Sequence, residues 1–269
     1  MNDIIKKSND MIAKFRYKLS KPQTRLIHYL ICRLRVDDAD FKTYSLPVAD
    51  ILATTGMSSQ GAYNKIRTEA QSLMKKVFTF EEFVEGQQVQ KTFAWFSFIG
   101  YVKNSGQIQV RFDKGLKPYL LELKRNFITY PLAYTFKMRF NSVRIYEFLK
   151  QASVFKSSKT FNLEILKQQL QIDKMPCYED YNHIKTKILL PAIKEITENT
   201  EIKVLKLEDT GKAHKKGNKI VTFTLFFELQ VPPKESEVRA LALESLASSG
   251  DEILENFDPD PIPFQVGTE

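Results

Sequence analysis

The clearest pattern of apolar and polar positions lies between residues 175 and 229. Over residues 178–200, apolar side chains recur at three- and four-residue steps, which predicts a long helix with one buried face. These positions are Tyr181, Ile184, Ile188, Ala192, Ile193 and Ile196. Residues 202–208 then predict a strand, and clean alternation over 220–231 predicts a second one. Pro191 removes a hydrogen bond inside the helix, so we expect a bend there.

A polar turn over residues 209–219 joins the two predicted strands, and it is rich in glycine and lysine. A helix followed by a hairpin with a basic tip is the arrangement of a winged helix. Its helix fits a DNA major groove, which is about 12 Å wide, while its hairpin tip reaches phosphates. A solvated α+β surface gives the same pattern, because exposed lysines carry little information about fold. The rest of the chain is needed to distinguish a winged helix from a solvated α+β surface.

The first half of the chain predicts a similar order of elements. A helix capped by Ser20 runs to about Val36, and a short strand over 41–46 follows. A helix over 47–56 and one from Ser58 or Ser59 to about 76 form a helix-turn-helix. Strands are predicted over 77–84, 91–102 and 107–112. Residues 113–124 predict another helix, whereas 1–13 are a loose lead-in and 127–140 an irregular join.

The second half repeats this order, with a helix capped by Asn141 or Ser142, a short strand and a helix over 163–170 before the long helix and hairpin. The sequence therefore predicts an α+β fold of two tandem winged-helix domains. We place the domains at residues 1–136 and 137–232. Residues 233–269 are acidic and punctuated by proline, which predicts a flexible tail that is partly helical and then disordered.

The charge of the chain is unevenly distributed. The formal net charge is +8, and the stretch from Lys234 onward holds two basic and nine acidic residues. Residues 1–233 therefore carry +15 and the tail −7. A strongly basic body indicates a polyanionic partner such as nucleic acid, although many basic proteins bind nothing specific.

Several classes of protein fit the sequence poorly. No apolar run approaches the roughly 18 residues of a membrane span, and the first ten residues lack the apolar core of a signal peptide. We therefore expect a cytoplasmic protein. Cys32 and Cys177 lie far apart and match no metal-ligand spacing, so we expect core or half-buried thiols in a reducing compartment.

Five stretches together resemble the replication initiators of iteron-containing plasmids, the Rep-3 or initiator replication protein family. The resemblance covers roughly residues 5–229, and the last three stretches are specific in combination. The stretches are Lys7-Ser8-Asn9 followed by Tyr17-Lys18-Leu19-Ser20, Asp40-Phe41-Lys42-Thr43-Tyr44, Leu116 to Lys124, Ser142 to Lys150, and Leu190 to Ile196. The family is built of two winged helices, in agreement with the repeat described above.

The resemblance implies a function without a catalytic step and without a cofactor. Members of this family bind direct repeats at a plasmid origin as monomers, help open an adjacent AT-rich segment, and recruit the host initiator and the replicative helicase. As dimers they repress their own promoter or couple origins. The C-terminal winged helix is the main DNA reader, and the N-terminal one provides a dimerisation surface and an auxiliary DNA contact. The acidic tail lies outside the resemblance.

Carried onto this chain, the resemblance gives three sets of candidate DNA-binding residues. Lysine can donate to guanine and asparagine can pair with adenine, but half or more of such contacts go to the DNA backbone. Base contact, phosphate contact and simple solvation thus stay open for each residue. The sets are Asn182, His183, Lys185, Thr186 and Lys187 on the reading helix; Lys212, His214, Lys215, Lys216 and Lys219 on the wing; and Ser58, Ser59, Gln60, Asn64, Lys65 and Arg67 in the first half.

Three alternatives remain beside the initiator. The first is a dimeric winged-helix transcriptional repressor that binds an inverted repeat. The second is a rolling-circle initiator that nicks DNA, which needs a pair of histidines on a metal near a tyrosine; the histidines, His28, His183 and His214, are scattered. The third is a scaffold that binds only proteins. The sequence has neither a phosphate-binding glycine loop nor a pair of histidines at metal-ligand spacing, so we expect neither a catalytic nor a metal site.

Overall fold

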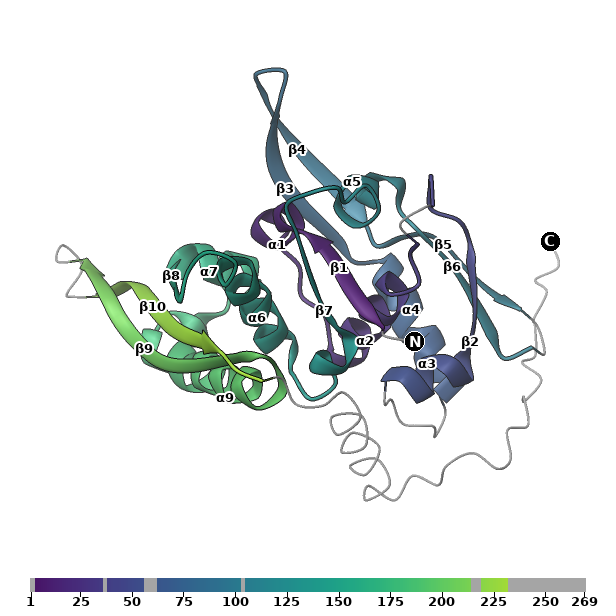
Figure 1. The fold of residues 1–269 in the computed structure, drawn as a ribbon. Helices are drawn as coiled ribbons and strands as arrows, with labels where there is room; N and C mark the ends of the chain where they lie inside the picture. Colours follow the sequence, from purple (N-terminus) through teal and green to yellow (C-terminus); the bar gives the residue numbers. More distant parts are fainter. Residues whose placement is uncertain (1–2, 36–37, 56–61, 103–104, 214–218, 232–269) are drawn as a thin grey trace.

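The computed structural model describes residues 3–35, 38–55, 62–102, 105–213 and 219–231, and within them two similar units follow one another (Figure 1). Each unit holds a three-stranded antiparallel sheet in which a short strand pairs with the second strand of a hairpin. In the first unit the order is β2 (Tyr44–Pro47), β6 (Gln107–Phe112), β5 (Phe96–Val102), and in the second β8 (Ser158–Asn162), β10 (Lys219–Leu229), β9 (Ile202–Ala213). The predicted tandem repeat of winged helices is confirmed.

The helices of the first unit are α2 (Lys21–Ile31), α3 (Val48–Thr55) and α4 (Ala62–Met74), which pack on one another. Ser20 caps α2 as predicted: its side chain accepts from the Gln23 N–H, while the Gln23 side chain accepts from the Ser20 N–H. The helix ends at Ile31, not near Val36, because the N–H groups of Arg33 and Leu34 donate to carbonyls only three residues back. The cap predicted for α4, Ser58 or Ser59, lies outside the described residues.

A further hairpin stands between α4 and the sheet of the first unit. Strands β3 (Val77–Val84) and β4 (Gln87–Ala94) pair only with each other among the named strands of the described chain, and they project from the body (Figure 1). The strand predicted over 91–102 is therefore wrong as one element. Fully buried Trp95 interrupts it, and its carbonyl accepts from the Asp113 N–H as the chain passes from one sheet to another. The helix predicted over 113–124 is only two short turns, η1 (Lys114–Leu116) and α5 (Lys117–Leu120).

Two segments that look irregular in sequence form a sheet with each other. Strand β1 (Ile4–Ser8) pairs antiparallel with β7 (Phe127–Pro131), and α1 (Asn9–Lys14) follows β1. Ile5, Met11 and Ile12 are fully buried. The predictions of a loose lead-in over 1–13 and an irregular join over 127–140 are therefore wrong: a two-stranded sheet too short to show alternation closes the core.

The second unit begins with α6 (Phe140–Ala152) and α7 (Leu163–Gln169). Arg139 is the N-cap of α6, and neither Asn141 nor Ser142 serves as predicted; Ser142 is itself buried in the helix. The N-cap of α7 is Asn162, whose side chain accepts from the Ile165 N–H. Helix α6 contacts α1 and β7 on one side and β8, β9 and the last helix on the other, so it is shared by both units.

The long helical run of the second unit starts at Tyr181, three residues later than predicted, because Asp180 caps it. It consists of α8 (Tyr181–Ile184), a π-helical turn η4 (Lys185–Leu189) and α9 (Leu190–Asn199). The π turn ends just before Pro191, which has no N–H to give to the helix. Strand β9 also continues to Ala213, beyond the predicted end at 208. The acidic tail, residues 233–269, lies outside the described residues.

Candidate DNA interface

The run from Tyr181 to Asn199 has one buried and one open face. Ile184, Ile188, Ala192 and Ile196 are buried, as their spacing predicts. Asn182, Thr186 and Lys187 are exposed on the other side, while His183 and Lys185 are half-buried. The structure therefore leaves the first two turns of this helix open to a partner, and the first turns are where a recognition helix contacts base edges.

The exposed candidates differ in how much hydrogen-bonding capacity they have left. The Thr186 hydroxyl donates to the Asn182 carbonyl at 2.9 Å, so its hydrogen is used within the helix and only its acceptor capacity remains. The His183 ring meets the Tyr178 ring edge-on, with centroids 5.6 Å apart. Among the described residues no ion pair involves Lys187. Asn182 and Lys187 therefore keep more of their side-chain hydrogen-bonding capacity than Thr186 and Lys185 do.

The reading helix is attached to the wing through one carboxylate. Lys185 Nζ lies 3.3 Å from Asp209 Oδ2, and the Tyr181 hydroxyl donates to the other oxygen of Asp209 on β9. Burial and then this carboxylate raise the pKa of Tyr181, so the phenol stays protonated as a donor. Sequence reasoning placed Asp209 in a polar turn and missed this role, since nothing in the local pattern marks it. Lys185 is therefore partly engaged within the protein.

The wing itself is only partly described. Strands β9 and β10 pair over their length, from Ile202 opposite Leu229 to Ala213 opposite Lys219. A Cβ atom on Gly211 would lie 2.3 Å from Thr222 Oγ1, which explains the glycine there. His214, Lys215 and Lys216 lie outside the described residues, and for Lys212 and Lys219 only the backbone is described.

The first unit repeats the link between helix and wing with other residues. On α4, Asn64 and Lys65 are exposed. Arg67 lies over the Tyr101 ring of β5 at 5.2 Å, and the Tyr101 hydroxyl donates to the Arg67 carbonyl at 3.0 Å. Burial raises the pKa of Tyr101 to about 12, so it too remains a donor. Ser58, Ser59 and Gln60 lie outside the described residues.

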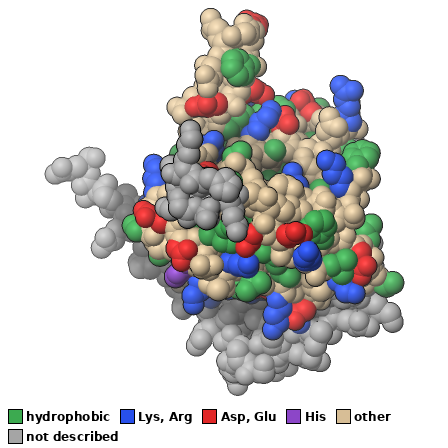
Figure 2. All heavy atoms as spheres, turned by 90° about the vertical axis from the view of Figure 1, so that its left-hand side faces the viewer, with side chains coloured by type: hydrophobic (Ala, Val, Ile, Leu, Met, Phe, Trp, Pro, Cys, Tyr) green, Lys and Arg blue, Asp and Glu red, His purple; other side chains and the backbone are tan. Residues whose placement is uncertain are grey.

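The face on the left-hand side of Figure 1 carries basic side chains interspersed with acidic ones (Figure 2). Two lysines of β9 are paired with carboxylates, Lys203 with Glu228 at 3.0 Å and Lys206 with Glu208 at 3.0 Å. The excess positive charge is therefore not a single patch here. Position on the helix and wing, more than density of charge, identifies the candidates.

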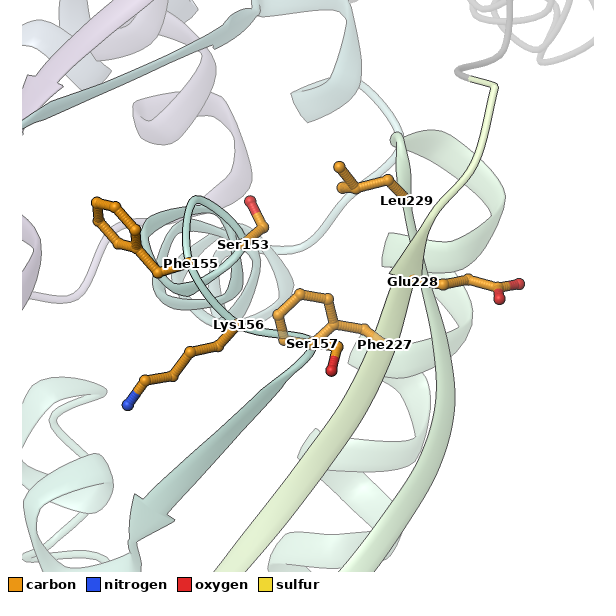
Figure 3. A pocket seen from close by; sticks show the side chains of 7 residues that line it. All are labelled: Ser153, Phe155, Lys156, Ser157, Phe227, Glu228 and Leu229. Carbon is orange, nitrogen blue, oxygen red and sulfur yellow. The ribbon is translucent and has the colours of Figure 1, made fainter.

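The surface of the second unit has a hollow. It measures about 330 Å³ and lies between the turn after α6 and the end of β10 (Figure 3). Its lining residues are Ser153, Phe155, Lys156, Ser157, Phe227, Glu228 and Leu229. Among the described residues no group of three or more His, Cys, Asp or Glu side chains could hold a metal ion. Both cysteines are free: Cys32 is half-buried as predicted, whereas the prediction is wrong for Cys177, which is exposed.

No helix in the described part of the chain is both long and apolar enough to cross a membrane. His28 lies in the core and not at the candidate interface, because only 2% of its surface is accessible. It therefore belongs to the internal architecture of the protein.

Comparison with known proteins agrees with this geometry. A family model described as initiator replication protein, WH1, matches residues 4–150, and one described as initiator Rep protein, WH2, matches residues 162–227. A replication initiation protein of Escherichia coli is 24% identical over 259 residues, which are 93% of this chain and 77% of that protein. The crystal structure of the Pi initiator protein in complex with iteron DNA has a TM-score of 0.66 and 19% identity, and the match covers 85% of this chain and 98% of that one. The last likeness bears on the fold.

Proposed function

Because this chain belongs to the initiator replication protein family, we propose that it starts plasmid replication by binding direct repeats, or iterons, at the origin. The observation that carries this proposal is the tandem arrangement of two helix-plus-wing units on a body of net charge +15 (residues 1–233). The Pi initiator protein, which shares the fold, was solved with iteron DNA. A protein of this kind acts by binding, and we assign it no bond-breaking step.

In the proposed complex, the start of the long helix enters the major groove. Asn182 and Lys187 project from its exposed side and read bases, and His183 and Thr186 line the same end. Lys185 stays on Asp209 and fixes the angle between helix and wing. Lys212, His214, Lys215, Lys216 and Lys219 of the wing contact phosphates, which adds affinity without sequence preference.

The first unit provides the second contact. Asn64, Lys65 and Arg67 of α4, with Ser58, Ser59 and Gln60 before it, contact DNA beyond the reach of the second unit. The same unit supplies the surface for dimerisation. Bound monomers help open an adjacent AT-rich segment and recruit the host initiator and helicase in the cytoplasm. We place the boundary between the two domains near residue 136, although α6 touches both.

The proposal is tested by a mobility-shift titration with the origin that neighbours its own coding region. We expect a ladder of shifted bands, one for each repeat, at concentrations where random duplex of equal length stays free. Equal affinity for both duplexes at matched salt would overturn the proposal. A symmetric footprint on an inverted repeat would instead indicate a dimeric repressor. A covalent tyrosine adduct on nicked supercoiled DNA would indicate a nicking enzyme.

A further inference from the structure

Helix α6 lies between the two units and is buried on nearly all sides. Phe140 and every residue from Ser142 to Leu149 are buried, including Arg144 and Glu147. Toward the second unit, the Tyr146 hydroxyl bonds Glu201 at 3.1 Å and the Phe148 ring meets Phe161 edge-on. Toward the first unit, α6 presents two charged side chains. Helix α6 is therefore packed against both units.

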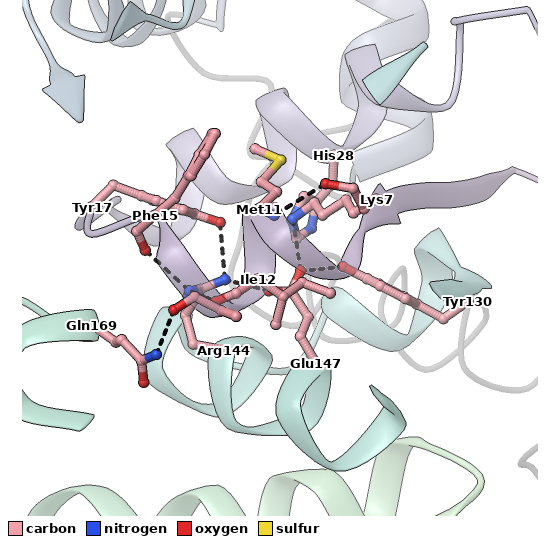
Figure 4. Close-up of polar contacts among 12 residues, drawn as sticks. Lys7, Met11, Ile12, Phe15, Tyr17, His28, Tyr130, Arg144, Glu147 and Gln169 are labelled. Carbon is pink, nitrogen blue, oxygen red and sulfur yellow. Dashed lines mark hydrogen bonds and ion pairs between the residues drawn. The ribbon is translucent and has the colours of Figure 1, made fainter. Parts of the chain in front are cut away.

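The two charged side chains of α6 form a buried network with residues of the first unit (Figure 4). Glu147 accepts from Lys7 Nζ and from the Tyr130 hydroxyl, both at 2.7 Å, and from Arg144 Nη1 at 2.8 Å. Burial disfavours its ionised form, but Lys7 and then Arg144 outweigh this and lower the pKa of Glu147 to about 2. The network thus fixes α6 on the sheet made by β1 and β7.

Arg144 also holds the segment 12–18, which leads from the end of α1 toward α2 and which we term the strap. Arg144 Nη2 donates to the carbonyls of Ile12 at 2.8 Å and Phe15 at 3.3 Å. The last carbonyls of a helix lack partners within it, and a cation is favoured at that end. Arg144 therefore stabilises the strap in one path, with its guanidinium over the Tyr17 ring at 4.8 Å.

The second unit holds the same strap from its other edge. Gln169 Nε2 donates to the Ala13 carbonyl at 2.7 Å, and Gln171 Nε2 donates to the Arg16 carbonyl at 3.2 Å. Four carbonyls of one short segment thus accept from three side chains on α6 and at the end of α7. Figure 4 shows Gln169 and Arg144 approaching the strap together.

The backbone conformation at Gln171 is a second observation about the contact between Gln171 and Arg16. Its φ of 53° places it in the left-handed region just after α7, where glycine is the usual residue. The left-handed backbone is strained for a glutamine, but the glutamine side chain can reach the Arg16 carbonyl. A glycine would suit the helix end better but could make no such bond.

We propose that Arg144, Gln169 and Gln171 form a joint that sets the spacing between the two winged helices, so that α4 and the α8–α9 run meet one repeat in fixed register. Arg144 is a positioning residue and touches no DNA. The inference rests on the proposed function for its consequence on DNA, whereas the rigidity of the joint stands apart from it. Linking two binding modules in the correct geometry raises the effective concentration of the second, so a loosened joint lowers affinity without altering either surface.

The joint is tested with Gln169→Ala combined with Gln171→Gly. Both contacts disappear, no buried charge is left unpaired, and the glycine relieves the left-handed backbone, so the protein should fold normally. Gln168→Ala, one position earlier on α7, is the matched control. Spin labels on native Cys177 and on Lys75→Cys, with Cys32 replaced by alanine, report the distance between the units without DNA.

We expect the double variant to at least double the width of the distance distribution, roughly tenfold weaker binding to a full repeat through lost effective concentration, and loss of footprint protection over the part contacted by the first unit. The control should match the parent. An unchanged distance distribution in the double variant would overturn the joint. If the parent shows no preference for repeats, the proposed function fails, but the distance measurement still decides whether the joint exists.

Discussion

The ammonium group of Lys185 lies 3.3 Å from a carboxylate oxygen of Asp209, so the helical run α8–α9 and strand β9 are joined by one ion pair. The side chains are 32% and 30% exposed. Pairs this accessible contribute little to folding, about 0.2–1 kcal/mol. The main effect of the pair is therefore on Lys185, because the pair partly neutralises the charge of this side chain and holds it in place.

Replacing Asp209 with asparagine should release Lys185 toward phosphate. We expect affinity for random duplex to rise several-fold, the slope of log affinity against log salt to steepen by about one contact, and the preference for repeats to fall because the wing is less well held. Salt titrations on both duplexes measure this. Glu228→Gln, which frees Lys203 at the other end of the hairpin, should leave both quantities unchanged. An equal rise in both variants would mean that net charge alone is responsible.

Replacing Lys187 should weaken binding to the repeat far more than replacing a lysine further along the same helix face. Lys187→Ala is expected to weaken binding to the repeat by about 1–3 kcal/mol if the side chain reads a base. Lys194, seven residues later, is 75% exposed and paired with Glu198, and its replacement by alanine should change little. Binding isotherms for repeats altered at single base pairs provide the measurement. Comparable losses for both lysines would refute base reading by Lys187.

Substitutions in the wing and in the reading helix should have different effects on DNA binding. Replacing Lys215 and Lys216, which lie outside the described residues, with alanine should weaken binding to all sequences and flatten the salt slope, because phosphate contacts carry no sequence information. Replacing Asn182 or His183 with alanine should change which repeats are preferred. A competition assay with a library of altered repeats separates the two effects, and equal losses on specific and random DNA for both sets would defeat the division of labour.

The buried stripe formed by Ile184, Ile188 and Ile196 could be predicted because, in a long helix, the spacing of the apolar residues shows which face is buried. The pairing of β1 with β7 could not. Its strands hold five residues each and lie more than a hundred positions apart, so neither local pattern nor composition joins them. Lys7 shows the difficulty well: a lysine near the start of a chain suggests solvent, yet this one is 1% exposed.

The candidate site divides in the same way. Residue type and helix position indicate Asn182 and Lys187 without coordinates. The role of Asp209 depends on a strand that continues into the segment predicted as a turn, and that of Gln171 on a left-handed backbone angle. Both arise from tertiary geometry, which no single stretch of sequence encodes. Such linking residues are therefore the part of the site that only the fold reveals.

Glu147 should be among the least replaceable carboxylates of the protein. Glu147→Gln would leave Lys7 and Arg144 buried without their counter-charge, which typically costs about 3–5 kcal/mol of the free energy of unfolding. Glu208→Gln, which breaks the exposed pair with Lys206, should cost less than about 1 kcal/mol. Urea unfolding monitored by circular dichroism compares the two. Equal small losses would show that the buried network contributes no more than a surface pair.

His28 should make the protein less stable as the solution becomes mildly acidic. Burial, and then the Lys7 ammonium, hold the pKa of His28 well below its usual value of 6.5, although Glu147 acts in the opposite direction. Lys7 Nζ lies 2.8 Å from His28 Nε2, so that nitrogen accepts and the ring is neutral. Below pH 6.5 the unfolded chain gains a proton that the folded chain refuses, which lowers the free energy of unfolding by up to about 1.4 kcal/mol per pH unit.

Glutamine at position 28 can still accept from Lys7 but takes no proton. His28→Gln should therefore flatten the stability profile between pH 6.5 and 5, where Glu147, with a pKa of about 2, does not yet titrate in the folded protein. The contribution of Glu147 is lost only as pH falls further, from its ordinary value of 4.5 toward 2. Urea unfolding at half-unit pH steps separates the two groups. A variant profile parallel to that of the parent over pH 6.5–5 would show that another group causes the loss, and that His28 is not held neutral.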